Sequence, residues 1–404
     1  MNQAPIKLVI TFWTLFTFPS VAQTAAEKMS ALGYPAIPAS IRGEKSTRNP
    51  NSIGLTAPAH SGDWALADIG FFRVFNPLFQ AIDPKTTPCS KSTIVAVVDT
   101  GIDYTHADLV DALWVNQGEV GQWAPQAGWV PPAGIDALCR DRSCNGIDDD
   151  ANGFADDVIG WDFVHNIAAP YDIIGHGSHI AGIIAATGRS QMSGVCSGAS
   201  IMTLKYYDPT NPGANNLSNL VRSIHYAAAN GADIINFSGG GVEPAESELK
   251  AVRAAREMGV LIVTAAGNQG RSNDLFGSYP ANYPVDNILS VASVDSENKV
   301  LPSSNYGQRV HLAAPGSEIL STLPQGGLGR LTGTSQATAY VTGAAAFLMS
   351  QLGKHTSYDY IKIKSWLTRG AKSLPSPKVI AHGLLSLPDS LKLLRAEEAH
   401  VSKN

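Results

Sequence analysis

The chain has 404 residues, of which 44% are hydrophobic and only 16% are charged, enough apolar material for one large core or two domains. Its net charge of −5 gives no general electrostatic reason to expect nucleic acid or an anionic membrane as a partner. No internal apolar run is long and clean enough to span a bilayer, so we expect no stable membrane insertion once the N-terminal segment is removed.

The N-terminal segment, residues 1–22, has the layout of a secretory signal peptide. Lys7 precedes an apolar run at 8–18, and residues 20–22 offer small side chains before a cut. An uncleaved membrane anchor is the alternative, but the apolar run is shorter than a spanning helix needs. Residues 23–63 are rich in Pro, Ser, Ala and Gly and are expected to form a poorly ordered leader. The sequence therefore predicts a secreted protein, extracellular or periplasmic.

The first element of the folded part is the β-branched run at 93–98, which is typical of a buried parallel strand. Asp99 follows this run directly and precedes Thr100 and Gly101. Sites in parallel α/β sheets lie at the carboxyl ends of strands, so Asp99 is a candidate site residue. Taken alone, the same aspartate could simply cap a loop.

An acidic loop at 148–157 has the oxygen-ligand spacing of a calcium-binding loop, with Gly153 at the turn. The candidate ligands are Asp148, Asp150, Asn152, Phe154 (through its carbonyl), Asp156 and Asp157. Where an EF-hand places its closing Glu, the chain has Ile159, so Asp157, Asp162 or water would complete the shell. Carboxylates packed this closely repel one another without a cation, which favours structural calcium over a solvated acidic loop.

His176 lies between two glycines at the start of a small-residue run that predicts a helix. Beyond it we expect helices at 216–230 and 246–258, and strands at 201–205, 233–237, 260–264 and 287–294. Strands that alternate with helices predict right-handed βαβ units and a parallel sheet covered on both faces. Asn268 follows a strand end as Asp99 does. Separately, His176 could be a satisfied buried histidine and Asn268 a left-handed turn residue.

Ser335 lies where a glycine turn leads into an Ala-rich, helix-favouring run. Free backbone N–H groups and the positive end of the helix dipole favour developing negative charge at such a position. The alternative is that Thr334 or Ser335 only caps the helix. Asp, His and Ser are the residue types that an activated-serine mechanism requires, and an amide such as Asn268 can support the oxyanion. Together the four candidates predict a nucleophilic serine site whose chemistry needs no cofactor.

Four segments resemble, in chain order, the Asp, His, oxyanion and Ser motifs of the subtilisin-like serine proteases, the subtilase family: 97–103, 176–182, 265–268, and 333–335 with 341–343. The resemblance implies that Ser335 is the nucleophile and His176 the general base and then acid. Asp99 would hold the imidazole, and Asn268 would donate to the oxyanion. The implied activity is hydrolysis of peptide bonds through an acyl-enzyme.

The resemblance also implies a fold. It is an α/β three-layer sandwich, with a central, mostly parallel sheet of about seven strands between helices. One catalytic domain would cover 64–394, leaving 395–404 as a C-terminal tail. The stretch at about 116–165, which holds the acidic loop, is then an insertion. The implied partner is a polypeptide substrate, and we expect the protein to be a monomer.

The chain departs from the family pattern at three positions. Gln336 stands where the family usually has Met, and Ala339 stands where it has Pro, although Ala suits a helix at least as well. The residue after Ser238 is usually bulky, but here it is Gly239, which predicts a roomier or more mobile wall. The substrate-binding residues would be Ser238, Gly239, Gly240, Ala265, Ala266, Gly267 and Ser278. None is charged, which favours uncharged side chains before the cut and a broad specificity.

The 4 cysteines permit three pairings, and a secreted protein can keep disulfides. Cys139 and Cys144 lie directly before the acidic loop and could close a small ring there. Cys89 and Cys196 each precede a strand, and the two strands are parallel neighbours in the subtilase sheet. The resemblance therefore implies a Cys89–Cys196 pair beside Cys139–Cys144.

Two functions from other classes remain as alternatives. A catalytically inactive subtilase fold could act as a binding protein, although no catalytic position is lost. An esterase or lipase is the second alternative, but its G-x-S-x-G elbow is absent and its chain order would be Ser, Asp, His. Reaction with a fluorophosphonate tests the first alternative, and comparison of a peptide with a short-chain ester tests the second.

Overall fold

A computed structural model describes residues 64–71, 89–120, 145–189, 192–211, 215–352, 356–378 and 380–401. The predicted signal peptide, the leader at 23–63 and the pair Cys139–Cys144 lie outside these residues. Within the described ranges, no helix is both long enough and apolar enough to cross a membrane.

The strands are β1 (Ile94–Asp99), β2 (Gly160–Asp162), β3 (Ser200–Lys205), β4 (Ile234–Phe237), β5 (Leu261–Ala265), β6 (Ile288–Val294), β7 (Leu312–Pro315), β8 (Ile319–Leu323), β9 (Gly327–Leu331) and β10 (Gly383–Leu384). The helices are α2 (Trp64–Asp68), the short 3-10 helix η3 (Val110–Ala112), α4 (His176–Ala185), α5 (Asn216–Ala229), α6 (Glu246–Glu257), α7 (Thr334–Ser350), α8 (Asp359–Arg369) and α9 (Leu387–Val401).

Within the described residues, the central sheet has eight strands in the order β10-β7-β6-β5-β4-β1-β3-β2, and neighbouring strands pair in parallel throughout. The predicted parallel sheet is confirmed, with eight strands instead of about seven. The chain places β2 and β3 on one side of β1 and then crosses to β4 on the other side. Parallel α/β folds bind ligands at such a switch in strand order, outside the carboxyl ends of the strands.

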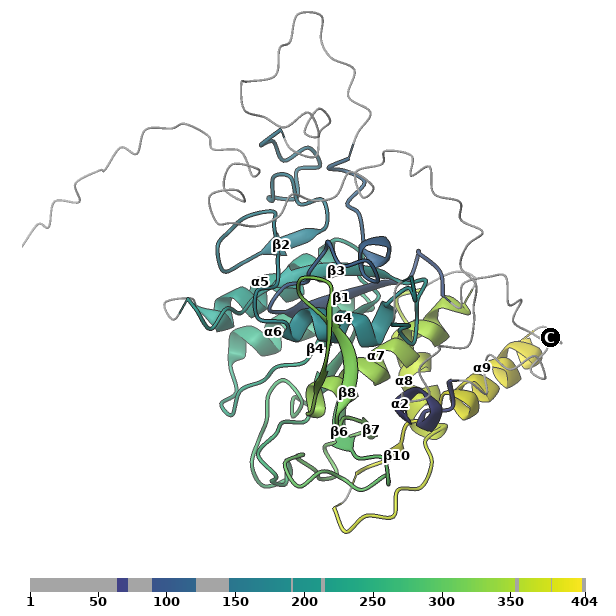
Figure 1. The fold of residues 1–404 in the computed structure, drawn as a ribbon. Coiled ribbons are helices and arrows are strands. Elements are labelled where there is room, and N and C mark those ends of the chain that lie inside the picture. The colour runs from purple at the N-terminus through teal and green to yellow at the C-terminus, as the bar shows by residue number, and fades with distance from the viewer. Residues whose placement is uncertain are drawn as a thin grey trace, which may run out of the picture.

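Alternation along β1 assigns the two faces of the sheet. Val95 and Val97 belong to the core cluster that includes residues of α4 and α7. Ala96 and Val98 belong to the cluster that includes residues of α5 and α6. Successive side chains of a strand point to opposite faces, so helices cover both sides and the fold has three layers. Figure 1 shows these layers, with the chain just after α2 reaching the start of α9, where the Ile69 carbonyl accepts the Leu387 N–H.

Helix α7 passes through the interior, and its side chains from Thr334 to Met349 are buried. Its Ala and Gly content allows this close packing. A Cβ at Gly343, for instance, would lie only 2.7 Å from Val195 Cβ. Burial on all sides explains why this sequence is apolar without a polar face. It also fixes the N-terminal end of α7, which carries Ser335.

The elements predicted from the sequence are present, with bounds that differ by a residue or two. The antiparallel pair β8–β9 was not predicted, and α9 continues through Val401, past the expected domain end at 394. A disulfide joins Cys89 to Cys196, as the pairing of β1 with β3 implies.

Candidate active site

The predicted site residues gather at one edge of the sheet. Asp99 ends β1, Ser238 follows β4 and Asn268 follows β5, and these three strands are neighbours in the order β5-β4-β1. His176 is the first residue of α4, and Ser335 is the second residue of α7. Because α4 packs against α7, two helix N-termini and three strand ends contribute to one region.

Asp99 and His176 form a close pair, with His176 Nδ1 2.7 Å from Asp99 Oδ1. Asp99 is buried and its Oδ1 also accepts a bond from the Thr100 N–H, whereas the His176 side chain is 31% exposed. A proton on Nδ1 leaves Nε2 as the basic nitrogen. Burial alone lowers the pKa of His176, but the Asp99 carboxylate, with a smaller contribution from Asp172, outweighs burial and raises the pKa above its ordinary value.

Ser335 is 7% exposed and is held against the end of β4. Its hydroxyl donates to the Ser238 carbonyl at 3.0 Å, and the Ser238 hydroxyl donates to the Ser335 carbonyl at 3.1 Å. Among the residues described, no hydrogen bond joins Ser335 Oγ to His176. Such bonds often tighten only when substrate is present, so this geometry leaves a nucleophilic role open.

Asn268 is oriented by Thr334, the first residue of α7. Its Oδ1 accepts hydrogen bonds from both the N–H and the hydroxyl of Thr334, each at 3.0 Å. With Oδ1 used in this way, the Nδ2 donor is left for another acceptor. The adjacent Gly267 has φ +111° and a Cβ there would lie 2.5 Å from Asn305 Nδ2, so only glycine fits. The Asn305 side chain fixes this turn further by accepting the N–H of Gln269.

In the segment 238–240 after β4, Gly239 and Gly240 face different neighbouring residues. A Cβ at Gly240 would lie 2.9 Å from the Tyr279 carbonyl and 3.8 Å from Ser278 Oγ, which places the predicted pocket base on that side. A Cβ at Gly239 would instead lie 2.5 Å from Tyr206 Oη and 2.9 Å from Phe237 Cζ. Tyr206 therefore fills the space beside Gly239, which contradicts the roomier wall predicted from the sequence, while the alternative of a more mobile wall stays a prediction.

Other predicted pocket residues lie along the neighbouring strand. Ala265 ends β5, and Ala266 and Gly267 lead from it to Asn268. The Ala266 carbonyl accepts bonds from the side-chain amides of Asn273 and Asn305. These buried amides set the path of the loop beside the pocket.

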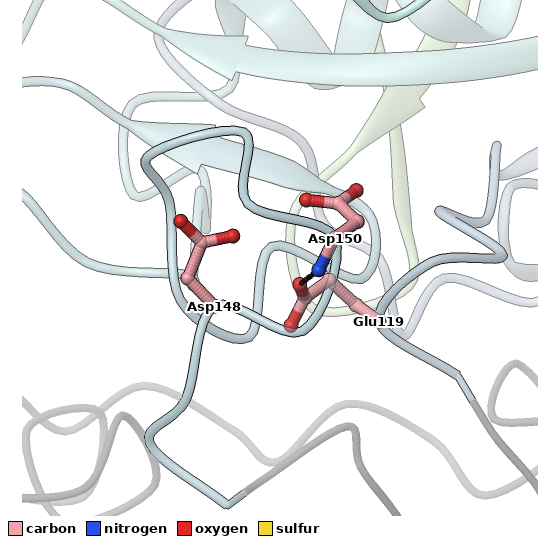
Figure 2. Close-up of side chains that lie close together, drawn as sticks. All are labelled: Glu119, Asp148 and Asp150. Atoms are coloured by element: carbon pink, nitrogen blue, oxygen red, sulfur yellow. Dashed lines mark hydrogen bonds between the residues drawn. The ribbon is translucent and has the colours of Figure 1, made fainter.

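The acidic loop forms a carboxylate cluster that differs from the predicted ligand set. Oxygen atoms of Glu119, Asp148 and Asp150 lie within 4.8 Å of one another. Figure 2 shows Glu119 below Asp150, whose backbone N–H donates to Glu119 Oε1. Glu119 is fully buried, and burial raises the pKa of its carboxyl to about 7. A set of carboxylate oxygens, one of them buried, has the chemistry that calcium prefers.

The other predicted side-chain ligands also make hydrogen bonds, as Asp148 and Asp150 do. Asp156 accepts the N–H groups of Asn145 and Gly146, and Asp157 accepts the hydroxyl of Tyr226 and the side-chain amide of Asn116. In Asn152, Oδ1 accepts the N–H of Phe154, while its Nδ2 donates to Asp157. The Phe154 ring packs edge-on against Trp161, Phe163 and Tyr226 and anchors the loop to the core.

Three residues near these sites were not predicted from the sequence. Glu119 is separated from the acidic loop by residues 120–147, so no local spacing links them. Tyr206 follows β3 and reaches Gly239 only through the strand order. Asp172 lies four positions before His176, and an Asp just ahead of a helix start is a capping signal that could have been noticed.

Comparisons with known proteins agree with this geometry. The model of the Subtilase family, Peptidase_S8, matches residues 90–384. Thermitase of Thermoactinomyces vulgaris is 40% identical over 196 residues, which are 48% of this chain and 68% of thermitase. Subtilisin BL of Lederbergia lenta is 35% identical over 228 residues, 56% of this chain and 81% of that protein.

Two solved structures are similar in fold. A mutant of the protease domain of PatA has a TM-score of 0.57 and 27% identity, covering 77% of this chain and 98% of that one. A cold-adapted subtilisin-like serine proteinase has a TM-score of 0.54 and 24% identity, covering 74% of this chain and 90% of that one. The second likeness concerns the fold alone.

Proposed function

The chain belongs to the subtilase family, and we propose that it is a secreted serine endopeptidase that cleaves peptide bonds through an acyl-enzyme. The observation that carries this proposal is the Asp99–His176 pair, 2.7 Å between Oδ1 and Nδ1, at the sheet edge where Ser335 lies in the first turn of α7. A serine, an imidazole and a buried carboxylate at one edge are the parts of an activated-serine site.

The roles follow from the chemistry of each group. Ser335 Oγ leaves the Ser238 carbonyl and attacks the substrate carbonyl while His176 Nε2 takes its proton. Asp99 holds the imidazole with Nδ1 protonated and stabilises the imidazolium. The Ser335 N–H and Asn268 Nδ2 donate to the oxyanion, and the bonds from Thr334 to Asn268 hold that amide in place. His176 then protonates the leaving amine.

The substrate is an extended polypeptide that pairs with the segment at 238–240. Its side chains alternate across this segment, so one set faces Ser278 and the other faces Tyr206. No charged side chain belongs to the predicted pocket residues, which supports broad specificity for uncharged residues before the cut. The aromatic wall of Tyr206 and Phe237 supports apolar groups on the opposite side.

Calcium would be held by Glu119, Asp148 and Asp150, with water or further loop oxygens completing its shell. The ion would neutralise the cluster and stabilise the insertion. None of the three carboxylates belongs to the proposed catalytic groups, so the role is structural.

Secretion is supported by the signal-peptide layout and by the Cys89–Cys196 disulfide, which persists in an extracellular or periplasmic environment. We place the protein there as a monomer.

Labelling with a fluorophosphonate tests the proposal. The secreted protein should react once, and peptide mapping should find the label on Ser335. Prior heating to unfold the protein should abolish labelling. A folded protein that remains unlabelled would support the inactive binding fold. Turnover of a short-chain ester without hydrolysis of any peptide in a library would support the esterase.

A further inference from the structure

The carboxylate of Asp172 is buried directly beside the start of α4. Its Oδ1 accepts bonds from Thr100 Oγ1 at 3.0 Å, the Ile174 N–H at 2.9 Å and the Gly175 N–H at 2.8 Å. Its Oδ2 accepts the N–H of Ser178 at 2.9 Å and its hydroxyl at 2.7 Å. A side chain with 0% exposure and donors on both oxygens is fixed in position.

These bonds connect the two elements that carry the Asp–His pair. Thr100 follows Asp99 at the end of β1, and its hydroxyl accepts the N–H of Gly177, which follows His176 in α4. The groups that donate hydrogen bonds to Asp172 therefore lie both at the end of β1 and in the first turn of α4. A shift of either element would break bonds to the same carboxylate.

Helix α4 also lacks a side-chain cap at its own N-cap residue. Gly175 occupies that position with φ 100°, and it has no side chain that could cap the helix. The Asp172 carboxylate takes this place, because it accepts the N–H of Ser178 in the first turn as well as the N–H groups of Ile174 and Gly175 just before the helix. A negative charge at a helix N-terminus is favourable for the dipole as well.

We propose that Asp172 is a positioning residue for the reaction, holding Asp99 and His176 in register for proton transfer. This inference rests on the proposed serine-protease function. Asp172 does not touch the substrate segment at 238–240 in the described structure, so its effect is on the chemical step and not on substrate binding.

The charge of Asp172 gives a second consequence. The charged or titratable groups that act on His176 are Asp99 at the end of β1, Asp172 in the preceding loop and His179 one turn along α4. Burial lowers the pKa of His179 to about 4, so it is neutral above that pH. Loss of the Asp172 charge removes one of two groups that raise the pKa of His176. The acid limb of the pH profile of kcat/KM, where activity falls as the pH drops, reports the pKa of His176 in the free enzyme. Without the Asp172 charge this limb moves to lower pH.

The test compares Asp172→Asn with Asp359→Asn. Asp359 is 2% exposed, begins α8 and accepts the N–H and hydroxyl of Thr356, so it is a buried carboxylate with local donors, away from the site. For Asp172→Asn we expect kcat at the pH plateau to fall about 10- to 100-fold with KM unchanged, since small misplacements of catalytic groups are costly. The acid limb should move to lower pH. The control should change neither kcat nor the limb, whatever it does to the melting temperature.

Thr100→Val decides the matter if Asp172→Asn does not fold. This variant removes the hydroxyl that links Asp172 to Gly177 but keeps the charge, so kcat should fall while the acid limb stays in place. The proposal would be overturned if folded Asp172→Asn kept the parent kcat and its acid limb did not move. It would also be overturned if Thr100→Val kept the parent kcat. An unmodified chain without peptidase activity would instead refute the proposed function.

Discussion

The wall beside Gly239 offers a quantitative test, because two glycines of one segment have different surroundings. A Cβ at 239 would lie 2.5 Å from Tyr206 Oη and 2.9 Å from Phe237 Cζ, whereas the nearest atom to a Cβ at Gly241 is the Glu243 carbonyl oxygen at 4.0 Å. Phe237 is 2% exposed in β4 and belongs to a core cluster, so its ring is packed against other buried side chains. Overpacking of this kind costs about 1–3 kcal/mol, or about 5- to 150-fold in kcat/KM if the segment shifts away from the substrate.

The assay is kcat/KM on an apolar peptide, together with the melting temperature, for Gly239→Ala and for Gly241→Ala as the control. The first variant should lose activity by the stated factor and the second should not. Adding Tyr206→Phe to Gly239→Ala should recover part of the loss, because it removes the closest atom. Equal kcat/KM for the two alanine variants would refute the conclusion that Tyr206 fills this wall.

Three further outcomes are expected. Asn268→Ala should lower kcat about 10²–10³-fold with little change in KM, and steady-state kinetics showing full kcat would remove it from the oxyanion site. A calcium chelator should lower the melting temperature while initial rates at low temperature hardly change. Asp148→Asn should reproduce this with calcium present, but Asp295→Asn, another half-buried carboxylate that accepts two backbone N–H groups, should not. An unchanged melting temperature on chelation would exclude the metal. Replacing Cys89 and Cys196 by Ser should cost about 4–5 kcal/mol in denaturant unfolding, since the disulfide spans 107 residues, and equal stability would contradict this.

Much of the fold could be predicted because its signals are local. The run at 94–99 is buried on both faces and consists of β-branched and small residues, so its strand is visible without tertiary information. The sequence of helix α7 is also informative, because its Ala and Gly residues match its close packing against the sheet and against α4. The candidate catalytic residues sit next to such elements, at strand ends or helix starts, and could be found from them.

The remaining features depend on contacts between distant segments. Gly239 indicates open space when only the sequence is considered, yet Tyr206 fills that space from the next strand but one in the sheet. Glu119 joins Asp148 and Asp150 only after the chain folds back, and Asp156 and Asp157 turn to other partners. A spacing rule borrowed from continuous calcium loops cannot anticipate a carboxylate contributed by another segment.

The central claim is that Ser335 is the nucleophile of a peptidase, and the most direct measurement is peptide hydrolysis by Ser335→Ala. Ser390→Ala, which alters another buried serine that donates to a backbone carbonyl, serves as the control. Both variants should keep a cooperative melting transition. Ser390→Ala should hydrolyse the peptide at close to the parent rate, and Ser335→Ala should show no turnover above a trace. Substantial hydrolysis by folded Ser335→Ala would contradict the assignment of the nucleophile.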